Sequence, residues 1–227
     1  MKVLDMGYIE LVETWGSDER IVEAARMSTN KGFQNWEQDE KLLRYLYTHK
    51  HDTPFEMAGA VVEVKAPIMV FREWHRHRTQ SYNEMSARYI PLPDENYVPA
   101  PEDLVQRSAQ AATSTNRQAS GTGKVLDLVE AATDVIALED YYREGQRLYN
   151  RFLDHGWPKE LARLPVTVGR YSRMRAAANL RNWLGFLVLR DSLNAQKEIR
   201  AYAEALVVLL TEAFPRTLAL YQAGVRK

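Results

Sequence analysis

Arginine and histidine side chains are concentrated between Arg72 and Tyr89, where the chain reads R-E-W-H-R-H-R-T-Q-S-Y-N-E-M-S-A-R-Y. Arginine presents a planar fork of donors that matches phosphate, and its charge is permanent at neutral pH. The Ser, Asn and Glu residues that follow supply the mixed donors and acceptors that a base or a sugar requires. The stretch therefore predicts a site for an anionic ligand that also carries hydrogen-bonding groups.

The overall charge limits the kind of ligand. The chain has 227 residues with 30 basic and 30 acidic side chains, so its formal net charge is zero. Proteins that coat nucleic acid usually carry a basic excess. A local cluster of cations on a neutral protein is better suited to a small anionic ligand, and we expect no nucleic-acid partner.

The chain contains no cysteine. This excludes disulfides, thiolate metal sites and a cysteine nucleophile. The N-terminal residues M-K-V-L-D-M-G-Y are too poor in apolar side chains for a signal peptide, and no apolar run has the length of a membrane span. We therefore expect a cytoplasmic protein with no membrane partner.

Simpler explanations exist for parts of this cluster. Arg76, His77 and Arg78 could be solvated cations that favour the C-terminal dipole of a helix. His49 and His51, like His75 and His77, are spaced two residues apart, which puts both rings of a pair on one face only in a strand. The neighbouring arginines would repel a divalent cation, so we predict no metal site.

Other nucleotide motifs are missing. The Gly121 and Gly123 pair before Lys124 lacks the glycine at position 118 and the Ser or Thr at position 125 of a phosphate-binding P-loop. There is no G-x-G-x-x-G and no G-x-S-x-G sequence, so neither a Rossmann site nor a serine-hydrolase elbow is predicted.

A second basic region lies far along the chain. Arg181 and Arg190 stand in the mostly apolar stretch R-N-W-L-G-F-L-V-L-R, where an unpaired arginine would be costly. We expect each to have an anionic partner or to lie at an interface. The other members of this region are Arg163, Arg170, Arg173 and Arg175.

Local patterns predict a mixed α/β fold. We expect a strand over Val3–Val12 and a helix that begins after the N-cap Ser17, with Asp18 and Glu19 in its first turn. A second helix is expected over Trp36–His49, with Leu42, Leu43, Tyr45 and Leu46 inward, ended by Thr53-Pro54. Alternation predicts a strand over Ala60–Lys65.

The segments that follow carry the cation cluster. We expect a helix over Ile68–Arg78 with Phe71 on its apolar side, and a polar loop over Ser81–Tyr89. Residues 91–123 are predicted to be a mobile insertion. Helices are expected over Val125–Asp154 and Arg190–Tyr221, the latter with Ile199, Ala203, Leu206 and Leu210 inward. Leu164–Leu189 carries both strand-like and helix-like signals.

Taken together, these residues resemble the flavin-dependent thymidylate synthases. Arg76-His77-Arg78, then seven residues, then Ser86 is the R-H-R-x7-S signature of that family, and Ser81, Asn83, Glu84 and Arg88 continue the match. Further blocks keep the family's order: Ala25 to Ser28, His49 to Glu56, Ala162-Arg163, Asn179 to Arg181, and Arg190 to Ser192.

The resemblance implies an activity and a fold. The family makes dTMP from dUMP, with methylenetetrahydrofolate as carbon donor and with FAD, reduced by NADPH, as hydride source. It implies a single domain over residues 1–227, with an antiparallel sheet flanked by helices, that assembles as a homotetramer with shared active sites.

The resemblance also implies roles for single residues. Arg190 would be catalytic and would stabilise the uracil as its N3 ionises. FAD would contact Thr53, Glu56, Arg76, His77, Arg78, Glu84, Asn179, Leu180, Arg181 and Gly185. The substrate dUMP would contact Glu73, Arg76, Glu84, Met85, Ser86, Ala87, Arg88, Arg163 and Arg190. Ser86 would be a ligand rather than a nucleophile, because no base is evidently paired with it.

Three positions depart from the family pattern. Asn194 stands where the family often has His, Gly185 where Asn or His is common, and Glu73 where Gln is frequent. A carboxylate at Glu73 near a phosphate would be unfavourable unless an arginine pairs with it or it faces the base. Two alternatives remain: a non-catalytic nucleotide- or RNA-binding protein that uses the arginine and aromatic side chains, and a paralogue that keeps the fold without turnover.

Overall fold

The structure is a computed structural model that describes residues 1–113 and 124–224. Part of the expected insertion, including Gly121 and Gly123, lies outside the described residues. The chain divides into two compact units, one formed by Met1–Met85 with Ser172–Lys227 and the other by Ser86–Tyr171.

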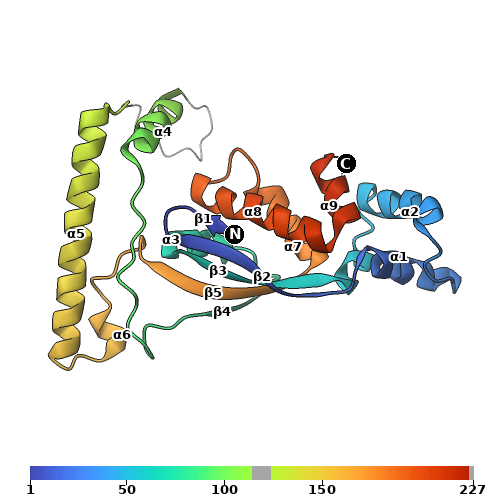
Figure 1. The fold of residues 1–227 in the computed structure, drawn as a ribbon, viewed down its shortest axis with the longest axis horizontal. Helices are drawn as coiled ribbons and strands as arrows, with labels where there is room; N and C mark the ends of the chain where they lie inside the picture. The colour runs from blue at the N-terminus through green and yellow to red at the C-terminus, as the bar shows by residue number, and fades with distance from the viewer. Residues whose placement is uncertain (114–123, 225–227) are drawn as a thin grey trace. The chain divides into compact units, whose positions relative to one another are not determined.

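A five-stranded sheet is the framework of the first unit, with strand order β1-β2-β3-β5-β4 (Figure 1). The pairs β1–β2, β2–β3 and β4–β5 are antiparallel. The strands are β1 (Lys2–Val3), β2 (Gly7–Trp15), β3 (Gly59–Pro67), β4 (Ser81–Glu84) and β5 (Tyr171–Asn179). The prediction of a mixed α/β protein with an antiparallel sheet flanked by helices is therefore confirmed.

The alternation of β3 determines which face of the sheet is covered. Ala60, Val62 and Val64 are fully buried, whereas Glu63 and Lys65 on the opposite face are partly exposed. The expected strand over Ala60–Lys65 is confirmed and extends at both ends. Helices α7 (Leu180–Arg190) and α8 (Lys197–Ala213) cover the apolar face (Figure 1).

Helix α8 confirms its predicted pattern. Ile199, Ala203, Leu206 and Leu210 are all fully buried. The helical region expected over Arg190–Tyr221 is confirmed in type but is interrupted twice, first by residues 191–196, which are not helical. Phe214 leaves helical geometry at φ −134° and ψ 63°, and Pro215 begins a separate helix, α9 (Pro215–Gln222).

The N-terminal region follows the predicted signals only in part. The expected strand over Val3–Val12 is two strands, because Leu4 has a left-handed φ of 58° in the turn between them. Helix α1 (Asp18–Arg26) begins as predicted, with the Ser17 hydroxyl accepting a hydrogen bond from the Arg20 N–H at 3.3 Å. A short 3₁₀-helix, η1 (Met27–Thr29), follows it.

Helix α2 (Trp36–Thr48) confirms the second predicted helix and corrects two details. Tyr45 is 50% exposed and stacks on His49 at 4.2 Å between ring centroids, so it does not point inward. The helix ends at Thr48, because Lys50 takes a left-handed φ of 57°. Thr53-Pro54 begins the 3₁₀-helix η2 (Thr53–Met57) instead of ending α2.

Helix α3 (Ile68–Trp74) is shorter than the helix expected to reach Arg78. The Tyr82 hydroxyl lies within hydrogen-bond distance of two main-chain carbonyls, Trp74 O at 3.2 Å and His77 O at 2.6 Å. The Trp74 carbonyl also accepts from the His77 N–H, three residues on, at 3.0 Å, so the main chain after Trp74 forms a turn and not another turn of α-helix. The expected loop over Ser81–Tyr89 is wrong at its start, because Ser81–Glu84 pairs with β5 as β4.

The second unit is largely helical. Within residues 91–123, where an insertion was expected without an assigned element, the structure contains helix α4 (Pro101–Thr113). Proline at the first helical position and the acidic Glu102 and Asp103 in the first turn favour a helix start. Helix α5 (Leu128–Asp154) confirms the helical region predicted over Val125–Asp154 and begins with a capping box between Asp127 and Glu130. A short helix, α6 (Lys159–Ala162), follows.

Arg170 organises the second unit from within. Its side chain is 2% exposed, and it donates to the Pro93 carbonyl at 2.6 Å and to the Gln146 amide oxygen at 2.8 Å. These bonds tie the segment before α4 to helix α5. Among the described residues, no helix combines the length and the apolarity that crossing a membrane requires.

Candidate active site

Aromatic packing in the first unit brings the end of α3 against α7. Trp74 lies 4.6 Å from Phe186 between ring centroids and 6.4 Å from Trp183. The Trp74 indole N–H donates to Gln80 Oε1 at 3.0 Å, and the Trp183 indole N–H donates to the Ala60 carbonyl at 3.0 Å. Both indoles are therefore fixed by packing and by a hydrogen bond, and they hold the neighbouring polar residues in place.

Arg190, the last residue of α7, is held by two residues from the end of α3 and the turn after it. Its Nη1 donates to Glu73 Oε2 at 2.6 Å, and its Nη2 donates to the Glu73 main-chain carbonyl at 3.0 Å. Its Nε donates to His77 Nε2 at 2.9 Å. The expectation that Arg190 has an anionic partner is confirmed, and the departure at Glu73 places a carboxylate in an arginine pair.

His77 is neutral in this arrangement. Burial, and secondly the positive charge of Arg190, lower the pKa of its imidazole from 6.5 to about 4, against a smaller opposing effect of Glu73. The Arg190 Nε–H can donate only to an unprotonated Nε2, so geometry and pKa agree. The imidazole ring also packs against the Phe186 ring, with 4.8 Å between the ring centroids.

Arg76 and Arg78 differ from Arg190. Both side chains are exposed, and within the described residues neither makes a hydrogen bond or an ion pair. Their charges are not offset by the protein. They are therefore available to an anionic ligand beside the neutral His77.

The N-terminus of α7 gathers a second group of predicted residues. The Asn179 side chain caps the helix by accepting from the Asn182 N–H at 3.0 Å, and Arg181 forms an ion pair with Glu56 of η2. Thr53 opens η2 and is exposed. Leu180 is fully buried and its N–H donates to the Ala58 carbonyl at 2.7 Å, so its side chain belongs to the core.

Gly185 and Asn194, two of the departures, are both exposed. A Cβ at Gly185 would meet no atom within 4 Å, so open space lies beside this turn of α7. The Asn194 main-chain N–H donates to the Ser192 hydroxyl at 3.2 Å. At Gly185, no neighbouring atom takes the place of the side chain that the family often has.

The remaining predicted residues fall into both units. Glu84 ends β4 opposite Met174, and the Met85 N–H donates to the Arg173 carbonyl at 2.8 Å, both in the first unit. In the second unit, the Arg88 Nε lies 4.0 Å from a Glu160 carboxylate oxygen, and the Arg163 Nε donates to the Glu160 carbonyl at 3.3 Å. The second unit also contains Ser86, whose hydroxyl accepts from the Arg88 N–H at 3.4 Å, and Ala87, which is 3% exposed.

Sequence reasoning missed Asn182. Its side-chain N–H donates to the Thr79 carbonyl at 3.0 Å and so fixes the turn after Arg78 to helix α7. Its place three residues after the capping Asn179 was the available signal, but its partner lies more than a hundred residues away in sequence.

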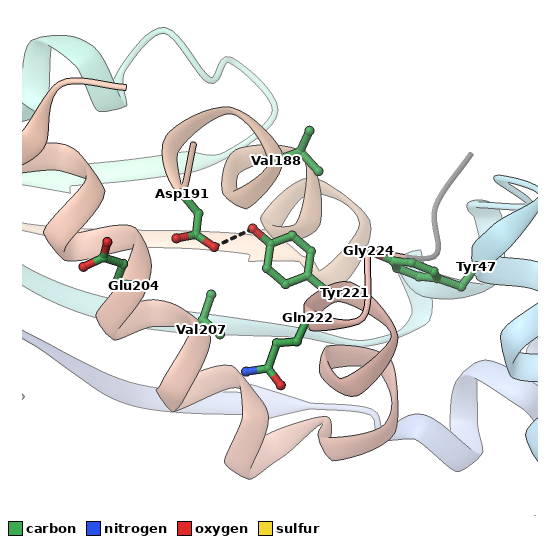
Figure 2. Close-up of a pocket in the computed structure, with 8 residues that line it drawn as sticks. All are labelled: Tyr47, Val188, Asp191, Glu204, Val207, Tyr221, Gln222 and Gly224. Atoms are coloured by element: carbon green, nitrogen blue, oxygen red, sulfur yellow. Dashed lines mark hydrogen bonds between the residues drawn. The ribbon is translucent and has the colours of Figure 1, made fainter. Parts of the chain in front are cut away.

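A hollow of about 550 Å³ lies on another side of α7 (Figure 2). In it the Tyr221 hydroxyl donates to Asp191 Oδ2 at 2.8 Å, and burial raises the pKa of Tyr221 above its usual value. Its carboxylates, from Asp191 and Glu204, would repel an anion. The remaining residues that line it are Tyr47, Val188, Val207, Gln222 and Gly224. The cations described above are therefore the better candidate for an anionic ligand.

Metal chemistry has no support from the geometry. In the parts of the chain that the structure describes, no three His, Asp or Glu side chains gather closely enough to hold an ion. His75 Nε2 lies 3.1 Å from the Met174 sulfur, and His49 Nδ1 lies 3.0 Å from the Tyr45 carbonyl.

Comparison with known proteins identifies the family. A family model described as "Thymidylate synthase complementing protein" matches residues 10–216. The flavin-dependent thymidylate synthase of Wolbachia pipientis wMel is 39% identical over 214 residues, which cover 94% of this chain and 73% of that protein. The chain belongs to the flavin-dependent thymidylate synthase family. The resemblance inferred from the sequence is confirmed at that level.

One further relative and one solved structure extend the comparison. The enzyme of Ehrlichia ruminantium (strain Gardel) is 37% identical over 222 residues, covering 97% of this chain and 72% of that protein. Among solved structures, the UMP/dUMP methylase PolB from Streptomyces cacaoi, bound with 5-Br dUMP, superposes with a TM-score of 0.83. It is 31% identical, with 98% of this chain and 97% of that chain covered.

Proposed function

We propose that this chain is a thymidylate synthase that makes dTMP from dUMP, with methylenetetrahydrofolate as carbon donor and reduced FAD as hydride source. NADPH would reduce the flavin. The observation that carries the proposal is the match to flavin-dependent thymidylate synthases along 97% of the chain. The absence of cysteine supports it, because a thiolate attack on uracil is impossible and the cofactor must supply the chemistry.

The residues present fit a flavin dinucleotide. Its pyrophosphate requires cations that the protein does not already neutralise, and Arg76 and Arg78 meet that condition. Bound reduced FAD would supply the hydride, and the protein would position it. The residues proposed to hold FAD are Thr53, Glu56, Arg76, His77, Arg78, Glu84, the Asn179–Arg181 segment and the open side of Gly185.

The substrate dUMP combines a phosphate with an ionisable base. We assign its binding to Glu73, Arg76, Glu84, Met85, Ser86, Ala87, Arg88, Arg163 and Arg190. Arg190 is proposed as the catalytic residue, because a fixed guanidinium favours negative charge as the uracil N3 ionises. Its rigid attachment to Glu73 and His77 supports that role.

The proposed quaternary state is a homotetramer in the cytoplasm. The proposed dUMP ligands are divided between the two compact units. A tetramer with shared active sites would allow residues from neighbouring subunits to complete one site.

The first test is spectroscopic and enzymatic. Purified protein should be yellow, release FAD on unfolding, and convert dUMP to dTMP only when methylenetetrahydrofolate and NADPH are both present. Each component should be omitted in turn as a control, with dTMP measured by mass spectrometry. Colourless protein that also fails to bind added FAD would overturn the proposal and favour a non-catalytic nucleotide- or RNA-binding protein.

UMP should be assayed beside dUMP. The structural relative PolB is named a UMP/dUMP methylase, and it superposes over almost the whole chain. This likeness makes methylation of UMP a second candidate activity. Formation of 5-methyl-UMP at a rate comparable to dTMP would identify the chain as a methylase of both nucleotides.

A further inference from the structure

The attachment of Arg190 distinguishes it from the other proposed ligand-binding arginines. Its guanidinium donates to three acceptors, of which two, Oε2 and the main-chain carbonyl, belong to Glu73. One donor bond is used on each of Nη1 and Nη2, so each of these atoms keeps an N–H for a ligand. The side chain is therefore fixed and still able to donate.

Glu73 is the counter-charge of this group. The Arg190 side chain is only 16% exposed, and a guanidinium at such a site requires a partner. His77 accepts a hydrogen bond but is neutral, so it offsets no charge. Among the described residues, Glu73 is the only carboxylate in an ion pair with Arg190.

We propose that Glu73 is the positioning residue of this site, which fixes the plane of the Arg190 guanidinium and offsets its charge before a pyrimidine nucleotide binds. This inference rests on the proposed function. The negative charge of Glu73 lowers the affinity of the site for the nucleotide anion. Its side-chain oxygen increases the precision with which Arg190 faces the base.

Two substitutions separate charge from geometry. Glu73→Gln keeps an oxygen that can accept from Nη1 but removes the negative charge. Glu73→Ala removes the side-chain oxygen as well. Both variants keep the Glu73 main-chain carbonyl and the His77 acceptor, so Arg190 retains two of its three bonds.

The expected results differ in kcat and in affinity. In Glu73→Gln, the dissociation constant and the KM for dUMP should fall about tenfold, because the ligand anion meets a cation that is no longer offset. Its kcat should fall less than that of Glu73→Ala, because the amide oxygen of Gln can still accept from Arg190 Nη1. In Glu73→Ala, kcat should fall by about 10- to 100-fold, because a guanidinium that has lost a bond is less precisely oriented.

The experiment measures the dUMP dissociation constant by calorimetry, kcat and KM by dTMP formation, FAD content and the thermal midpoint. Glu144→Gln is the matched control, because Glu144 also pairs with an arginine, Arg147, on the exposed helix α5. That variant should behave as the wild type. The inference is supported by tighter dUMP binding in Glu73→Gln together with low kcat in a folded, FAD-loaded Glu73→Ala protein.

Several outcomes would overturn it. One is an unchanged dissociation constant for dUMP in Glu73→Gln. Another is a kcat in Glu73→Ala that falls only in proportion to the fraction of protein that has lost its FAD or is unfolded. A failure of the proposed function is recognised separately, because the wild type would then form no dTMP. In that case the calorimetric comparison still decides the role of Glu73, and a wild type that does not bind dUMP overturns both.

Discussion

His77 should make the folded chain less stable as the pH falls from 6.5 toward 4. Burial, and then the charge of Arg190, lower the pKa of the folded imidazole to about 4, whereas an unfolded histidine titrates near 6.5. Between these values the unfolded chain binds a proton that the folded chain does not, so acid favours unfolding. The destabilisation is absent above pH 6.5 and complete below pH 4.

The size of the effect follows from the shift. A change from 6.5 to about 4 corresponds to about 3 kcal/mol at about 1.4 kcal/mol per pH unit. The imidazole is only half-buried, so solvent screening reduces the expected loss to about 1–2 kcal/mol. This is a measurable part of the free energy of unfolding of a typical domain.

The assay compares wild type with His77→Gln by urea unfolding at fixed protein and flavin concentration, between about pH 7.5 and about pH 4.5. The glutamine side chain can still accept from the Arg190 Nε but does not titrate. Wild type should lose about 1–2 kcal/mol more than the variant over this range. Parallel curves, or a wild type that gains stability in acid relative to the variant, would refute the placement of a neutral His77 against Arg190.

Three substitutions test the rest of the site. Arg190→Ala should abolish dTMP formation, measured by turnover, while most of the FAD stays bound, measured by flavin absorbance. Surviving turnover would show that Arg190 does not activate the uracil. Arg78→Ala should weaken FAD or dUMP binding while changing stability by less than about 0.5 kcal/mol, since its exposed side chain has no partner among the described residues. A large fall in the thermal midpoint with intact binding would contradict this. Gly185→Ala should raise the free energy of unfolding by about 0.5–1 kcal/mol in chemical unfolding, because a Cβ there meets no described atom within 4 Å and glycine weakens a helix. A destabilised variant would show that the fold needs the open space at this position.

The sequence predicts those elements that depend on residues close to one another in the chain. The Ser17 cap begins α1 because its hydroxyl binds an N–H three residues on. Likewise, the spacing of Ile199, Ala203 and Leu206 predicts the buried face of α8, since one stripe of a helix must meet the sheet.

The misses have local as well as long-range causes. Strand β4 is polar and was predicted to be loop, but its ladder with β5 joins residues about ninety positions apart. Helix α3 gives way to a turn after Trp74, where the His77 N–H bonds the Trp74 carbonyl and the Tyr82 hydroxyl of β4 contacts the Trp74 and His77 carbonyls. Helix α4 had a readable proline and acidic start, which the Ser, Thr and Gly residues after it concealed.

The candidate site shows the same division. The residue types in the arginine cluster predicted an anion site, and the carboxylate at Glu73 predicted either an arginine partner or a place that faces the base. That Arg190 is this arginine depends on a contact across 117 positions, made by the packing of Trp74 against Phe186.

The proposed ligand-binding arginines of the first unit separate into two classes with different expected effects. Arg190 and Arg181 are bound to Glu73 and Glu56, so their orientation is set before any ligand arrives. Arg76 and Arg78 are exposed and make no ion pair or side-chain hydrogen bond with any residue in the described ranges, so their charge is available and their orientation is not set by those residues. A paired cation contributes less net attraction and more geometric precision, because part of its charge is already offset. Loss of an unpaired arginine should therefore appear first in binding, and loss of Arg190 first in the chemical step.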